Sequence, residues 1–98
     1  KDPRVARSEL GKQSAGKLRL RLNELRNATD LSEIPHTPPA RLHMLKDKQE
    51  PTFAVSLHGG GRILFTIDED PIPQRPNGEI DRKMVRRITV TFVGDYHE

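Results

Sequence analysis

The chain has 98 residues, with 33% hydrophobic and 32% charged side chains, a formal net charge of +3 and no cysteine. These values fit one small folded domain over residues 1–98, and they exclude a disulfide framework, a thiol nucleophile and a disordered chain. No apolar run approaches the roughly 18 residues of a membrane span and no signal-peptide core is present, so we expect a cytoplasmic protein with no membrane partner.

The first predicted element is a short helix over residues 3–10. Asp2-Pro3 is a helix start signal, since the side chain of Asp2 can cap the helix and Pro3 has the φ of a first helical residue. Gly11 is a suitable stop. The chain starts at Lys1 rather than at a methionine, which is compatible with a further secondary-structure element before this helix.

A second helix is predicted from Ser14 to Arg26, although its pattern also fits a strand. Leu18, Leu20 and Leu22 alternate as in a strand, whereas Leu18, Leu22 and Leu25 form the stripe of a helix. The segment consists largely of Leu, Arg, Lys and Glu and has no β-branched residue. These residue types favour a helix.

The remainder of the chain is predicted to form a sheet. Three prolines within residues 35–39 exclude regular structure there and indicate a loop. Four strands are then predicted, at Arg41–Lys46, Thr52–Leu57, Arg62–Ile67 and Arg87–Val93. A glycine-rich hairpin joins the second to the third, an exposed loop spans Glu69–Asp81, and a short helical turn covers Asp81–Val85. We therefore expect an α+β fold with two N-terminal helices on one face of a small antiparallel sheet.

The positive charge is concentrated near the N-terminus. Residues 1–26 carry eight basic and three acidic side chains, a net +5. Such a segment is typical of a solvated helix face, and it can also attract phosphates or an acidic protein segment. The candidate cations of this surface are Lys17, Arg19, Arg21 and Arg26.

Two segments combine titratable side chains with a predicted strand, namely 42–46 and 94–98. RNA cleavage without a metal needs a base for the 2′-OH, an acid for the leaving 5′-oxygen and cations for the phosphate. His43, Asp95 and His97 can supply the acid and base, Lys46 and Arg62 the cations, and Tyr96 can stack on a base. Each of these residues also has a non-catalytic interpretation. His43 can be an ordinary strand histidine, residues 95–97 a polar C-terminal tail, and Lys46 and Arg62 surface cations. No histidine pair has a recognised metal-ligand spacing, so we expect neither a metal nor a cofactor.

Three segments in this order resemble the toxins of the HigB type within the RelE/ParE superfamily. Residues 41–46 (RLHMLK) are similar to their L-H-x-L-K segment, residues 62–65 (RILF) to their R-I-x-F strand, and residues 95–97 (DYH) to their terminal D-Y-H. The proline-rich residues 71–81 resemble an insertion found in a longer HigB-like subgroup. The resemblance covers most of residues 41–97 and reaches the helical half only in pattern.

The resemblance implies two helices on an antiparallel sheet, with a first strand that would precede Lys1. It also implies a ribosome-dependent endoribonuclease that cuts mRNA, with acid–base roles for His43, Asp95 and His97 and phosphate contacts from Lys46 and Arg62. A basic surface would contact ribosomal RNA. The implied partner is an antitoxin of the helix-turn-helix type, through which alone the toxin would reach operator DNA.

Two residues depart from the family pattern. Asp47 stands where the family commonly has glycine, and Phe53 replaces a Trp or Tyr, so we expect an altered rate or sequence preference. Two other functions fit the same fold: a ParE-like inhibitor that binds DNA gyrase without catalysis, and a non-toxic relative that binds only the antitoxin. A gyrase binder would not require His43, Asp95 and His97.

Overall fold

A computed structural model of the chain describes residues 16–46, 48–57 and 60–95. Residues 16–27 form a helix, followed by η1 (Leu31–Glu33) and by the strands β1 (His43–Met44), β2 (Thr52–Ser56) and β3 (Gly61–Ile67). A second 3₁₀ turn, η2 (Arg82–Met84), precedes the last strand, β4 (Ile88–Asp95). The fold class is therefore α+β, as predicted. The predicted helix over residues 3–10 lies outside the described residues.

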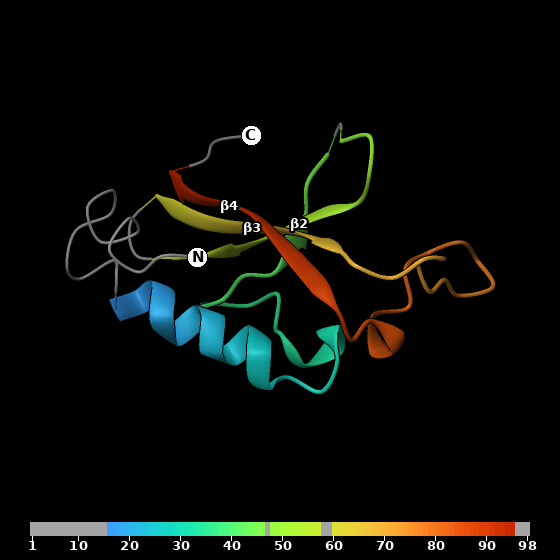
Figure 1. Cartoon of the computed structure of the whole chain (residues 1–98), viewed down its shortest axis with the longest axis horizontal. Coiled ribbons are helices and arrows are strands. Elements are labelled where there is room, and N and C mark those ends of the chain that lie inside the picture. Colours follow the sequence, from blue (N-terminus) through green and yellow to red (C-terminus); the bar gives the residue numbers. More distant parts are fainter. Residues whose placement is uncertain (1–15, 47, 58–59, 96–98) are drawn as a thin grey trace.

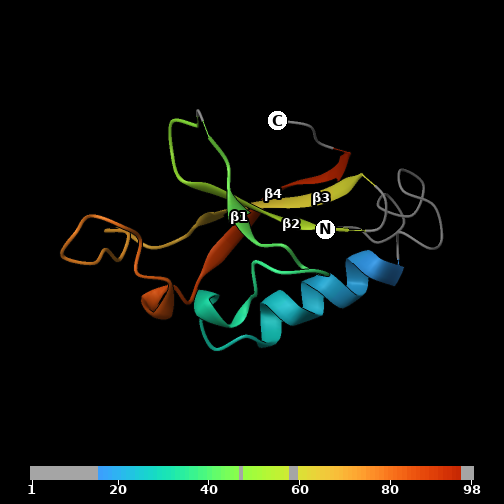
Figure 2. The ribbon, with the colours of Figure 1, turned by 180° about the vertical axis from the view of Figure 1, so that it is seen from behind.

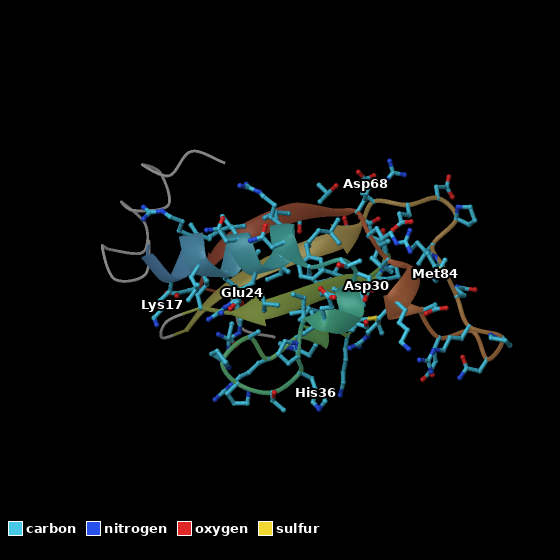
Figure 3. The ribbon with its side chains drawn as sticks, turned by 90° about the horizontal axis from the view of Figure 1, so that it is seen from below. Lys17, Glu24, Asp30, His36, Asp68 and Met84 are labelled. Atoms are coloured by element: carbon cyan, nitrogen blue, oxygen red, sulfur yellow. The ribbon has the colours of Figure 1, made fainter. Side chains whose placement is uncertain are left out.

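The four strands form one antiparallel sheet in the order β1-β2-β3-β4, so each strand pairs with its neighbour in the sequence. The helix, η1 and η2 all lie on one side of this sheet, as Figures 1 and 3 show. The described residues between β1 and β2, 45–46 and 48–51, rise on the opposite side in both ribbon views (Figures 1 and 2). The sheet thus has a face covered by the helix and an outer face.

The main core fills the space between the helix and the sheet. Phe53 of β2 and Phe65 of β3 stack with ring centroids 5.8 Å apart, and both are at most 1% exposed. Leu18 of the helix is buried against the same cluster, with Leu22 and Leu25 packed beside it. The helical stripe predicted from these leucines is therefore confirmed. Leu20, which the strand pattern would have buried, is 47% exposed.

The first predicted strand is much shorter in the structure. Only His43 and Met44 pair with β2, whereas the sequence predicted a strand over residues 41–46. The reason is that Arg41 adopts a left-handed φ of 53°, which turns the chain just before the strand. The other strand predictions are confirmed to within two residues, as are the exposed loop of residues 69–81 and the helical turn that becomes η2.

Arg21 was predicted to belong to an exposed basic surface, and this prediction is wrong. The side chain is 4% exposed, because it lies between the helix and β2. Its Nε donates to the backbone oxygen of Ser56 at 3.0 Å, and its Nη1 donates to the carboxylate of Glu24 at 2.7 Å. Arg21 therefore ties the helix to the sheet. Lys17, Arg19 and Arg26 are exposed on the same helix.

We expect Arg21→Ala to lower the free energy of unfolding by about 2 kcal/mol, because a hydrogen bond from a charged donor contributes about 1.5–3 kcal/mol. The matched control is Arg19→Ala, two residues away on the exposed side, which should change it by less than about 0.5 kcal/mol. Urea unfolding followed by circular dichroism measures both values. Equal effects of the two substitutions would contradict the tying role of Arg21.

A carboxylate closes the long loop between β3 and β4. Glu69 accepts the backbone N–H groups of Arg86 at 2.6 Å and Arg87 at 3.2 Å. The Arg86 hydrogen bond is the main reason that the pKa of Glu69 lies below its ordinary value of 4.5; the Arg87 amide and both positive charges act in the same direction, and desolvation opposes them. The backbone N–H of Asp68 also donates to Arg87, which joins the two ends of the loop.

Because this pKa is lowered by folding, the stabilisation by Glu69 is fully present above pH 4.5 and is lost as the pH falls through the folded pKa. An NMR titration should give a pKa below 4.5 for this carboxyl group. In Glu69→Gln, the free energy of unfolding should fall less steeply on acidification than in the wild type. If the free energy of unfolding fell equally with pH in the two proteins, Glu69 would not be the source of this pH-dependent stabilisation.

Candidate functional site

The outer face of the sheet carries His43. Directly paired residues of adjacent strands place their side chains on the same face, and the register pairs His43 with Ala54, Ala54 with Leu64, and Leu64 with Phe92. One row of side chains therefore crosses the whole sheet from β1 to β4. Ala54 and Leu64 are buried together with Leu45 in a small second cluster, separate from the main core. This cluster forms an apolar floor beside His43.

Arg62 lies on the same outer face. It precedes Leu64 by two residues in β3 and pairs with Ser56 and Gly94. Its side chain is half-buried, and its Nη1 donates to the backbone oxygen of Gly61 at 2.8 Å. Strands β1, β2 and β3 contain no Asp or Glu, so a phosphate at this face would meet no carboxylate from them. His43 and Arg62 are thus two of the predicted site residues that the structure brings to one surface.

The imidazole of His43 is held by a backbone carbonyl. Its Nδ1 lies 3.0 Å from the oxygen of Arg41. A carbonyl oxygen can only accept, so Nδ1 carries the proton of this hydrogen bond, and in the neutral ring Nε2 is then the basic nitrogen. This tautomer is the one that a general base requires at Nε2.

The carbonyl of Arg41 is itself fixed by a tightly bonded loop. The backbone N–H of Arg41 donates to Thr37 at 3.0 Å, that of Leu42 to Pro35 at 2.9 Å, and that of Ser56 to Ala40 at 2.7 Å. These bonds hold Arg41 in its left-handed conformation, which costs about 1–2 kcal/mol in a residue with a Cβ. Strained backbone of this kind often occurs next to functional groups. The sequence offered no signal for it beyond the preceding prolines.

Phe92 is an aromatic residue of the outer face that the sequence analysis did not select. It is 37% exposed, and its ring lies against Gly94, because a Cβ built on Gly94 would come within 3.3 Å of the Phe92 Cζ. Gly94 has a φ of +149°, which other residues rarely adopt. The alternation of residues 88–95 would have placed Phe92 on one face with Gly94, and that signal was available in the sequence.

Asp95 is distant from His43. Asp95 pairs with Gly61, the neighbour of Arg62. Because successive residues of a strand alternate between the two faces of the sheet, Asp95 and Arg62 belong to opposite faces. Three inter-strand steps of about 4.8 Å also separate β4 from β1. Asp95 is exposed at the end of its strand. The structure therefore does not unite the predicted pair of His43 and Asp95.

Lys46 is exposed in the loop between β1 and β2. Tyr96, His97 and Asp47 lie outside the described residues. Phe53 is a core residue on the covered face, so its difference from Trp or Tyr bears on packing rather than on the outer face.

Within residues 16–46, 48–57 and 60–95, no group of three His, Cys, Asp or Glu side chains could hold a metal ion. The same part of the chain contains no helix long and apolar enough to cross a membrane. Comparisons with protein-family models, curated proteins and solved structures found no match to this chain.

Proposed function

We propose that the protein is a HigB-like toxin of a type II toxin–antitoxin pair, an endoribonuclease that cuts mRNA on the ribosome in the bacterial cytoplasm. The observation that carries the proposal is His43, whose tautomer the Arg41 carbonyl sets and which shares the outer face with Arg62. The proposal includes the RelE/ParE-like arrangement, with a further helix over residues 3–10.

In the proposed reaction, Nε2 of His43 removes the proton of the 2′-OH. The 2′-oxygen attacks the adjacent phosphorus in line, and the bond from phosphorus to the 5′-oxygen breaks. His97 donates a proton to that leaving oxygen, and a 2′,3′-cyclic phosphate remains, which water can open to a 3′-phosphate. Atoms and charge balance without a metal or an external oxidant.

Four further side chains have proposed roles in holding the RNA. Arg62 and Lys46 would bind the scissile phosphate and stabilise the negative charge that it gains in the transition state. Phe92 and Tyr96 would stack on unpaired bases, since aromatic rings are the usual platforms for single-stranded RNA. An acid–base role for Asp95 at the same phosphate would require the carboxylate to lie within hydrogen-bond reach of the RNA that His43 contacts, and three inter-strand steps separate β4 from β1.

Among the described residues, the outer face carries few titratable groups, which supports a dependence on the ribosome. A sparse site gains most of its rate from a substrate that something else positions. The exposed cations Lys17, Arg19 and Arg26 would contact ribosomal RNA. A helix-turn-helix antitoxin would neutralise the toxin and connect it to operator DNA.

The test is a purified translation reaction with a defined mRNA, in which primer extension maps cuts with and without ribosomes. We expect cuts only when ribosomes and protein are both present. A supercoiling assay with DNA gyrase is run in parallel. Gyrase inhibition without mRNA cuts would contradict this proposal and favour the ParE-like inhibitor. No effect in either assay would also contradict it, and would favour a protein that binds only the antitoxin.

A further inference from the structure

A second surface lies on the covered side of the sheet, away from His43. It is an open groove of about 840 Å³ between η1 with the following residues 35–36 and the segment of residues 74–83. Its floor includes Ile34, Met44 and Phe53. Met44 follows His43 in β1, so the alternation of the strand directs these two side chains to opposite faces. The groove is therefore separate from the proposed RNA site.

The rim of the groove is cationic. Arg75, Arg82 and Lys83 line it, and its one acidic lining residue is Glu79. The carboxylate of Glu79 is engaged by the side-chain amide of Asn77 at 2.9 Å. The guanidinium of Arg82 sits 5.4 Å from the centre of the Phe53 ring and covers it. Three cations against one carboxylate leave a net charge of +2 at the rim, without counting histidine.

These cations stand on an ordered frame. The backbone N–H of Arg75 donates to Glu79 at 2.7 Å, and the N–H of Gly78 donates back to Arg75 at 2.9 Å. Gly78 takes the φ of +90° that this turn requires. The backbone N–H of Asp81 donates to the backbone oxygen of Pro73 at 2.9 Å, and the backbone oxygen of Asp81 accepts from the N–H of Met84 at 3.0 Å. These two bonds join the turn to η2. Figure 3 shows η2, with Met84 labelled, beside η1 on this side of the sheet.

The floor of the groove suits a peptide better than a nucleic acid. Phe53 is 1% exposed beneath Arg82, so it offers no face on which a base could stack. The apolar surface that the floor does expose is aliphatic, since Met44 is 49% exposed. Methionine adapts its shape to different apolar side chains and is common in surfaces that bind peptides. Arginine at the rim is the preferred partner of carboxylates, which it can bind with two parallel hydrogen bonds.

We propose that this groove binds a short acidic segment of a partner polypeptide, whose carboxylates pair with Arg75 and Lys83 and whose aliphatic side chains rest on Met44. The observations that carry it are the complementary charge of the rim and the exposed aliphatic floor. The proposal does not depend on RNA cleavage, because the groove and the outer face lie on opposite sides of the sheet.

The test uses the full chain and a fluorescein-labelled synthetic peptide in which glutamate alternates with leucine. Fluorescence anisotropy should show saturable binding that weakens as salt rises. The double variant Arg75→Glu with Lys83→Glu should weaken binding by at least about tenfold, which corresponds to about 1.4 kcal/mol. The matched control is Arg19→Glu with Arg26→Glu, which changes the net charge equally outside the groove and should change binding by less than about twofold.

Two further measurements test the apolar floor and the class of ligand. Met44→Ser should weaken binding of the glutamate–leucine peptide and have little effect on a glutamate–serine peptide. Circular dichroism of each variant separates lost binding from lost folding. Equal loss in the groove and control variants would overturn the proposal, as would a single-stranded RNA that binds more tightly than the peptide and depends on Arg75 and Lys83.

Discussion

In His43→Ala, ribosome-dependent cleavage of mRNA should fall by a factor of about 10²–10⁴, the usual contribution of a positioned general base. The expectation follows from the contact between Nδ1 of His43 and the Arg41 carbonyl, which leaves Nε2 as the basic nitrogen on the outer face. Single-turnover cleavage on programmed ribosomes measures the effect, because it separates the chemical step from binding and product release.

The His43→Ala result needs a control for folding and one for position. His43 is half-buried on a two-residue edge strand, so its removal should change the free energy of unfolding by less than about 1 kcal/mol. Thr89→Ala alters an exposed residue of β4 and should leave cleavage unchanged. Full cleavage by His43→Ala would show that its imidazole is structural, and the acid–base groups would then have to be sought elsewhere.

Phe53→Ala should have the largest effect on stability, a loss of about 3–5 kcal/mol in the free energy of unfolding. The side chain is 1% exposed and stacks on Phe65, so its removal leaves a cavity in the main core. It would also take away the ring beneath the Arg82 guanidinium. Small domains have only about 5–15 kcal/mol in total, so this variant would be close to unfolding at physiological temperature.

The matched control for Phe53→Ala is Phe92→Ala, the same substitution at a ring that is 37% exposed. We expect it to cost about 1 kcal/mol, because less apolar surface is lost from the interior. Thermal and urea unfolding of both variants test the comparison. Similar losses at the two positions would contradict the placement of Phe53 in the core and of Phe92 on the outer face.

The fold could be predicted where one local pattern dominated. The leucine stripe of Leu18, Leu22 and Leu25 identified the helix, and the β-branched and apolar runs identified β2, β3 and β4. The prediction was wrong in extent for residues 41–46, because the turn at Arg41 depends on hydrogen bonds to Thr37 and Pro35, which no local propensity specifies. Tertiary contacts shortened that strand to His43 and Met44.

Arg21 shows how charge alone misleads. It was grouped with Arg19 as a surface cation because both are basic and lie in the same segment. The helical spacing places Arg21 three residues after Leu18 and four before Leu25, on the buried stripe. A long side chain can cross such a stripe and reach a backbone acceptor, here Ser56. The periodicity thus contained the signal, and the charge count concealed it.

The residue types of the candidate site could be predicted from the sequence. The strand register that decides which of these residues share a face could not. His43 and Arg62 share a face only through the pairing of β1, β2 and β3, and the sequence does not fix that register. The same register separates Asp95 from His43, which the motif alone could not show. The groove rimmed by Arg75 and Lys83 was also missed, because the sequence predicts only an exposed loop over residues 69–81 and a short helical turn over residues 81–85.

The most direct measurement of the central proposal is the chemistry of the new 3′ ends on mRNA translated in a purified system with this protein. Sequencing after end-specific ligation distinguishes a 2′,3′-cyclic phosphate or 3′-phosphate from a 3′-hydroxyl. We expect the phosphate-bearing ends on ribosome-bound mRNA only, and their loss in His43→Ala and in His97→Ala. Uncut mRNA, or 3′-hydroxyl ends that persist in both variants, would contradict the proposed ribonuclease.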